Sequence, residues 1–126
     1  MKIATLRGLR GAAGAVLGLV IGLTVVASPA QAADSTCSFT GTFCAWEDPG
    51  FAGARFNVRA LNPSVGTCVD LAAHGWGAGR IESARNTATQ AARLYSNSNC
   101  TGSSYLVQPG GSYSPVSFAS NSVYVY

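Results

Sequence analysis

The chain of 126 residues holds few side chains that could catalyse a reaction. Its one histidine, His74, follows Asp70 by four residues, but no serine has the sequence context of a catalytic nucleophile. Glu47 and Asp48 are adjacent, so at a strand end they point to opposite sides and cannot flank one bond. A zinc site needs three or four ligands, which one histidine and four disulfide-bonded cysteines do not supply. The sequence therefore predicts a protein that is not an enzyme and that uses no metal or cofactor.

The four cysteines, Cys37, Cys44, Cys68 and Cys100, are typical of two disulfides in an exported protein. Three pairings are open. We favour Cys37–Cys44, which closes a local loop, together with Cys68–Cys100, which ties distant segments. A crosslink of the second kind restricts the unfolded chain by roughly 3–4 kcal/mol in the chain-entropy description.

The N-terminal residues 1–32 have the pattern of a secretory signal peptide. Lys2, Arg7 and Arg10 precede an uncharged apolar run, and Ala30-Gln31-Ala32 supplies the small residues of a cleavage site. Export leaves one domain, residues 33–126, with five arginines and five acids, so its net charge is near zero. A neutral domain without lysine lacks the footprint of nucleic-acid binding. No second apolar run is long enough to span a membrane. The export signal predicts a secreted protein, and its small size and neutral charge are compatible with a monomer.

Short runs that alternate between apolar and polar residues predict an all-β domain. The clearest is Arg55–Ala60, in which Phe56 and Val58 face one way and Arg55 and Asn57 the other. Turn-forming Gly, Pro, Asn and Ser residues separate the runs. The other expected strands are Thr42–Glu47, Thr67–Leu71, Ile81–Asn86, Ala91–Ser96, Ser103–Gln108 and Ser122–Tyr126.

The two halves of the domain repeat one another at a shift of 49 residues, from Trp46 to Tyr95. An aromatic strand end, a polar turn, a glycine and a second aromatic strand recur in order. The glycine predicts a positive φ or a close contact over the turn. Each half ends on a strand with an inward serine, Ser83 or Ser122. The paired positions are Trp46 with Tyr95, Asp48 with Asn97, Gly53 with Gly102, Phe56 with Tyr105, and Val58 with Val107.

This repeat resembles the Greek-key motif of the βγ-crystallin superfamily, in which two motifs form a sandwich of two four-stranded sheets. The resemblance implies about eight antiparallel strands. The export signal, the Cys37-x6-Cys44 opening and the Trp46-Glu47-Asp48 turn are similar to the bacterial peptidase inhibitor I36 family. That resemblance implies a crystallin-like fold and inhibition of thermolysin-type metalloproteases, with an extracellular metalloprotease as the partner.

The same resemblance implies that inhibition depends on a Cys-Val bond, and it places this role on Cys68 and Val69. A disulfide beside an exposed bond would stiffen the loop and lower the entropy cost of binding. Val69 would offer the aliphatic side chain that a thermolysin-like pocket accepts. The alternative is that Val69, next to Leu71, belongs to a buried strand.

Calcium-binding crystallin-type domains resemble one another in a paired Asn/Asp stretch before two adjacent Ser/Thr residues. The corresponding segments here, Ala78–Ser83 and Ser117–Ser122, lack acidic pairs, and Arg80 would repel the ion. Ser83 and Ser122 are therefore expected to bond to the backbone of the preceding turn.

Two other functions remain open. The first alternative is a binding or defence module directed at a microbial surface, similar to crystallin-like killer toxins, and the second is a structural protein stabilised by calcium. A row of tyrosines fits either a binding stripe or cross-strand packing. These are Tyr95, Tyr105, Tyr113, Tyr124 and Tyr126.

Overall fold

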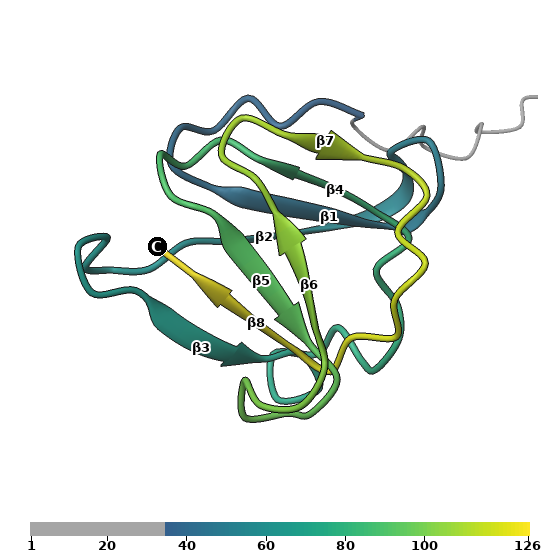
Figure 1. Cartoon of the computed structure of the whole chain (residues 1–126). Coiled ribbons are helices and arrows are strands. Elements are labelled where there is room, and N and C mark those ends of the chain that lie inside the picture. The colour runs from purple at the N-terminus through teal and green to yellow at the C-terminus, as the bar shows by residue number, and fades with distance from the viewer. Residues whose placement is uncertain (1–34) are drawn as a thin grey trace, which may run out of the picture. The chain divides into compact units, whose positions relative to one another are not determined.

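A computed structural model describes residues 35–126, which form eight antiparallel strands in two four-stranded sheets (Figure 1). The predicted signal peptide, residues 1–32, lies outside the described residues. Within the described part of the chain, no helix has the length and apolarity needed to cross a bilayer. The strands are β1 (Phe43–Asp48), β2 (Ala52–Val58), β3 (Thr67–Asp70), β4 (Ser83–Asn86), β5 (Ala92–Tyr95), β6 (Ser104–Val107), β7 (Ser112–Tyr113) and β8 (Ser122–Val125).

The two halves of the chain exchange one strand each. The first sheet has the order β2-β1-β4-β7, and the second has the order β3-β8-β5-β6. Strand β3 of the first half thus pairs with β8 of the second, and β7 of the second half pairs with β4 of the first. This exchange makes each half depend on the other, because neither half can complete its sheet alone.

All seven predicted strands are present, with ends that differ from the prediction by at most three residues. Strand β2 starts at Ala52, three residues before the expected Arg55, because the glycine-containing turn is included in the pairing with β1. The eighth strand, β7, was not predicted. It has only two residues, Ser112 and Tyr113, too few to show an alternating pattern.

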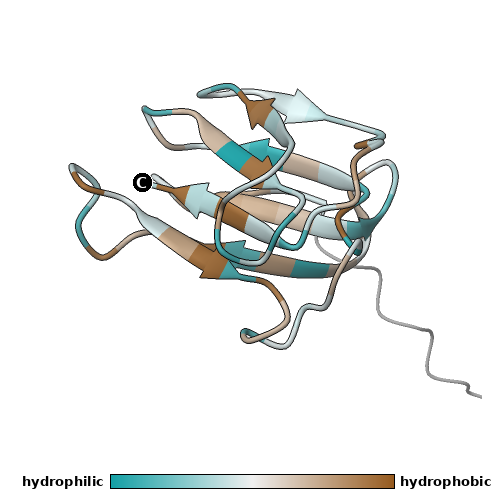
Figure 2. Ribbon diagram, turned by 60° about the horizontal axis from the view of Figure 1, so that its bottom comes forward, coloured by the Kyte–Doolittle hydropathy of each residue, from teal (hydrophilic) through white to brown (hydrophobic). Residues whose placement is uncertain are grey.

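The core lies between the sheets and is built from alternate residues of their facing sides. Figure 2 shows hydrophobic and hydrophilic residues following one another along the strands. Phe56 and Val58 pack against this core, as the alternation in β2 predicts. Each fully buried Leu, Ile or Val contributes about 1.5–3 kcal/mol to folding. The largest aliphatic members are Leu71, Ile81, Leu94, Val107, Val116, Val123 and Val125.

The turn between β1 and β2 folds back over the outer side of its own sheet. Successive strand residues face opposite sides, and Ala84 lies in the core, so the neighbouring Ser83 faces outward. Ser83 is nevertheless fully buried, because the turn covers it. Its hydroxyl donates to the Asp48 carbonyl at 2.7 Å and accepts from the Phe51 N–H at 3.0 Å. The expected bond to the turn is confirmed, whereas the inward orientation was wrong.

The turn between β5 and β6 repeats this arrangement. The Ser122 hydroxyl donates to the Asn97 carbonyl and accepts from the Cys100 N–H at 2.9 Å. Gly53 and Gly102 have φ angles of +79° and +90°, as the repeat predicts. A Cβ at Gly53 would lie 2.5 Å from an Asp48 carboxylate oxygen and would stand on a left-handed backbone, so a larger residue there would be strained.

Candidate functional site

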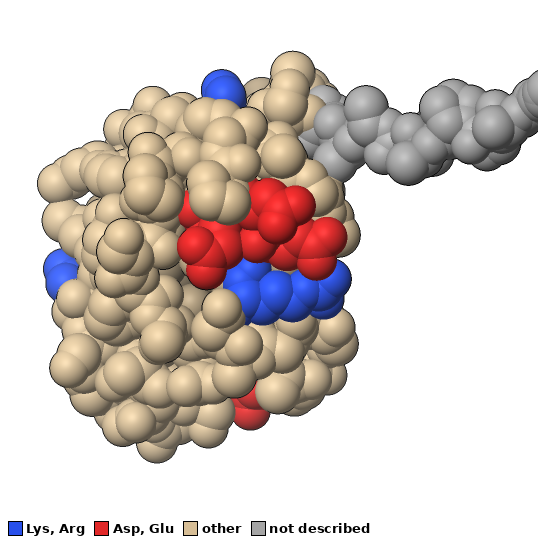
Figure 3. Space-filling view, turned by 90° about the vertical axis from the view of Figure 1, so that its right-hand side faces the viewer, with Lys and Arg blue, Asp and Glu red and all other residues tan. Residues whose placement is uncertain are grey.

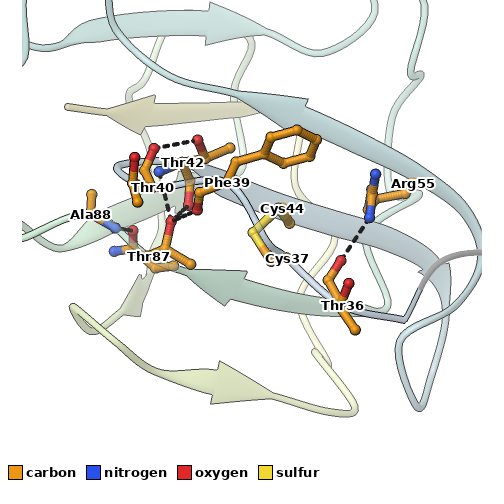
Figure 4. Close-up of a disulfide and its surroundings, with 10 residues drawn as sticks. Thr36, Cys37, Phe39, Thr40, Thr42, Cys44, Arg55, Thr87 and Ala88 are labelled. Atoms are coloured by element: carbon orange, nitrogen blue, oxygen red, sulfur yellow. Dashed lines mark hydrogen bonds between the residues drawn. A yellow bond between two sulfur atoms is a disulfide. The ribbon is translucent and has the colours of Figure 1, made fainter.

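The disulfides join Cys37 to Cys44 and Cys68 to Cys100, the pairing that the spacing favours. The first holds the segment before β1 against the outer side of the first sheet (Figure 4). There the Arg55 guanidinium donates to the Thr36 carbonyl at 2.6 Å and lies 5.3 Å from the ring centre of Phe39. The second disulfide joins β3, an edge strand, to the turn between β5 and β6. It therefore fixes the edge of the second sheet to the turn that covers that sheet.

The structure places Cys68 and Val69 in strand β3 and not in an open loop. Cys68 is exposed, but Val69 is only 3% exposed and belongs to the core. Val69 pairs with Val123 of β8. In this conformation a protease reaches the Val69 side chain only after β3 leaves the sheet. The arrangement is the buried strand that we considered as the alternative.

The connection from β2 to β3 exposes the aliphatic side chains that β3 does not. Leu61 is fully exposed, at 103% of its reference surface, and Val65 is 61% exposed. With Phe39 at 46%, they are the large hydrophobic residues that the described part of the chain leaves exposed. Sequence reasoning overlooked both, because they flank the turn signal Asn62-Pro63 and were assigned to no element.

Hydrogen bonds hold this connection in a fixed shape. The Asn62 carbonyl accepts from the N–H groups of Val65 and Gly66, at 3.1 and 2.9 Å. The Asn62 side-chain oxygen also accepts from the Ser64 hydroxyl at 2.7 Å. The Tyr124 hydroxyl donates to the Val65 carbonyl at 2.9 Å, and so fixes the connection to β8. This segment thus has few conformations to lose when it binds a partner.

Charge gathers on a different part of the surface. Figure 3 shows acidic and basic side chains in contact on the side of the molecule that lies at the right of Figure 1. Arg80 forms an ion pair with Glu47 at 2.8 Å, and its guanidinium lies 4.0 Å from the ring centre of Trp76. The pKa of Glu47 is lowered, first by the hydrogen bond from the Ala54 N–H and then by Arg80. Arg80 is thus engaged with Glu47 and Trp76.

His74 and Asp70 do not form a catalytic pair. The His74 Nδ1 lies 2.9 Å from the Asp70 backbone oxygen. The Asp70 carboxylate accepts from the Ala73 N–H and caps the turn. Among residues 35–126, no three His, Cys, Asp or Glu side chains lie close enough together to hold a metal ion.

The predicted row of tyrosines divides into two groups. Tyr105 and Tyr113 pack against the core and against each other, with ring centres 6.0 Å apart. Tyr124 and Tyr126 lie with ring centres 5.3 Å apart and line a surface hollow. The other residues of this hollow are Gln90, Ala91, Arg93, Tyr95 and Leu106.

Comparison with known proteins agrees with this fold. A βγ-crystallin from Ciona intestinalis has a similar structure, with a TM-score of 0.53 and 22% sequence identity. The likeness covers 68% of this chain and 100% of the crystallin. The prediction of a βγ-crystallin-like sandwich with about eight strands and two disulfides is thus confirmed. No curated protein matches the chain significantly.

Residues 30–107 match the sequence pattern of peptidase inhibitor family I36. This match covers more than half of the chain, and it confirms the predicted family. Members of a peptidase inhibitor family are not enzymes, in agreement with the shortage of catalytic side chains. The chain belongs to peptidase inhibitor family I36.

Proposed function

We propose that the protein is an extracellular inhibitor of a thermolysin-type metalloprotease. Membership of family I36 is the observation that carries this proposal. Two disulfides, with no free cysteine among the described residues, suit an oxidising environment outside the cell. They also help to stabilise a domain too small to depend on its core alone.

An inhibitor needs no catalytic group of its own, but it needs a stiff segment that fits the enzyme's cleft. The end of the sandwich where β3 begins supplies such a segment. The connection from β2 is held there by hydrogen bonds, and Cys68 ties the edge strand to Cys100. We assign Cys68 the role of anchor. Val69, at 3% exposure, fastens the same strand into the core.

Titration against a protease tests this function directly. The full chain is expressed with its N-terminal segment and purified from the medium, and N-terminal sequencing checks the predicted cleavage after Ala32. We expect stoichiometric loss of thermolysin activity on a peptide substrate, and no loss of activity of a serine protease assayed in parallel. Lack of inhibition by a folded, oxidised sample at micromolar excess would contradict the proposal and leave family membership as a statement about fold.

A second candidate function is binding to a glycan of a microbial surface. The hollow lined by Tyr124, Tyr126 and Arg93 favours it, because aromatic faces beside polar groups suit sugar rings. A glycan-binding assay with the wild-type protein and Tyr126→Ala would separate the two functions. Binding that the substitution abolishes, without inhibition of proteases, would favour the second.

A further inference from the structure

We propose that Leu61 is the side chain that enters the apolar specificity pocket of the target protease. This inference rests on the proposed function and assigns its contact residue. Figure 1 shows the connection between β2 and β3 at the left, reaching past the ends of the strands that it joins. The partner that we propose for this connection is a protease pocket that accepts aliphatic side chains, and Leu61 is the side chain that enters it.

The exposure of Leu61 is unusual for this domain. Leu71 and Leu94 are fully buried, whereas Leu61 is exposed at 103%. A single exposed leucine is common on protein surfaces, so exposure alone does not identify a site. Here Val65, 61% exposed, lies four residues away on the same connection. The two side chains place apolar surface at one end of the domain, where Leu61 lines a surface hollow together with the exposed Arg59.

The backbone on both sides of Leu61 is held in place. Ala60 is 5% exposed, and its N–H points to the Tyr126 carbonyl at 3.5 Å. On the other side, the Asn62 carbonyl accepts two backbone N–H groups, and the Gln90 side chain donates to the Pro63 carbonyl at 3.2 Å. Leu61 is thus a projecting side chain on a fixed backbone, and its insertion requires little ordering of the chain.

The same contacts predict how inhibition works. The turn at Asn62–Gly66 prevents the chain from running on through a cleft in extended form. The peptide bond before Leu61 begins at the buried Ala60, which shields it from attack. Leu61 therefore fills the pocket without presenting a peptide bond for cleavage, and we expect the inhibitor to dissociate from the complex uncleaved. Cleavage between Cys68 and Val69 would produce a cut chain held together by the disulfide.

Inhibition constants of matched variants against thermolysin test the inference. Leu61→Asp places a charge in the pocket and should weaken inhibition about 100-fold, whereas Leu61→Met keeps an apolar side chain and should stay within about threefold. The control is Ala78→Asp, which adds the same charge at another exposed position, after β3. We expect it to stay within about threefold of the wild type. All four proteins should melt at similar temperatures, because both positions are exposed.

The outcomes separate this inference from the proposed function. If the wild type inhibits and Leu61→Asp inhibits equally well, the role of Leu61 is wrong and the function stands. Recovery of a chain cut after Cys68 from the complex would equally exclude insertion of Leu61 as the mechanism. If the wild type does not inhibit, the function and the role of Leu61 fall together.

Discussion

Phe51 and Cys100 occupy the same position in the two halves of the fold, and both have a left-handed backbone, with φ angles of 60° and 59°. Each donates its N–H to the buried serine of its own half. In the first half the Phe51 ring packs edge-on against Trp46, with centres 5.4 Å apart, and lies 4.0 Å from the Arg85 guanidinium. In the second half Cys100 forms a disulfide with Cys68 instead. One half thus secures its folded turn by aromatic packing, the other by a covalent bond.

The two disulfides should contribute unequally to stability. Replacing Cys68 and Cys100 together by serine releases a crosslink between residues 32 apart, whereas the Cys37–Cys44 pair spans only seven. Loss of the disulfide that closes the longer loop should lower the free energy of unfolding by about 3–4 kcal/mol, and loss of the other by about 2 kcal/mol. Denaturation in guanidinium chloride measures both double variants against the wild type. A larger loss from the shorter loop would contradict the entropic argument.

The buried serines Ser83 and Ser122 should each be needed for stability. Substitution by alanine leaves one N–H and one carbonyl of the covering turn without a partner, which should cost about 1–3 kcal/mol. Ser120→Ala is the matched control. The Ser120 hydroxyl is also buried, but it has no hydrogen-bond partner among the described residues, so its removal should cost little. Equal losses in all three variants would show that burial, not hydrogen bonding, determines the effect.

Glu47 should make stability depend on pH in the acid range. Its pKa is lowered below 4.5 in the folded protein, chiefly by the Ala54 N–H and then by Arg80. A lowered folded pKa means that the stabilisation is present above the unfolded-state pKa and is lost as the pH falls through the folded value. The melting temperature of Glu47→Gln should therefore fall less steeply below pH 4.5 than that of the wild type.

Arg80→Met is the control for this titration. It keeps the hydrogen bond from Ala54, the first cause of the lowered pKa, and removes the hydrogen bond and the charge of Arg80, so it should retain part of the acid dependence. If Glu47→Gln and the wild type lose stability in parallel between pH 5 and pH 3, the carboxylate of Glu47 is not the cause of the pH dependence of stability.

The architecture could be predicted from the sequence because the two halves of the domain repeat the same order of strand, turn and glycine. Gly53 and Gly102, and the serines that bond to each turn, recur in the same order in both halves, so a comparison of the two halves detects them. Side-chain exposure at the β2–β3 connection is different, because it depends on where the chain leaves the sheet. Strand β2 ends at Val58, Ala60 is the last buried residue, and Leu61 falls outside. No local pattern distinguishes such a leucine from one that ends a strand.

The same difficulty affected Cys68 and Val69. A segment that reads Thr-Cys-Val-Asp fits both a loop beside a disulfide and a short edge strand. The pairing of β3 with β8 decides between them, because it turns Cys68 outward and Val69 inward. That pairing joins segments more than fifty residues apart, and the sequence contains no local sign of it.

Val69→Ala should lower stability and leave inhibition unchanged, whereas Leu61→Ala should weaken inhibition and leave stability unchanged. Val69 lies in the core, so shortening it should cost about 1–3 kcal/mol of unfolding free energy while the folded protein inhibits as before. Leu61 is fully exposed, so shortening it should change stability by less than about 0.5 kcal/mol and weaken inhibition about tenfold or more. Melting curves and inhibition constants, measured on the same samples, give both quantities. If Val69→Ala instead weakens inhibition while the protein stays folded, strand β3 leaves the sheet in the complex and the Cys68–Val69 bond is the one that enters the cleft.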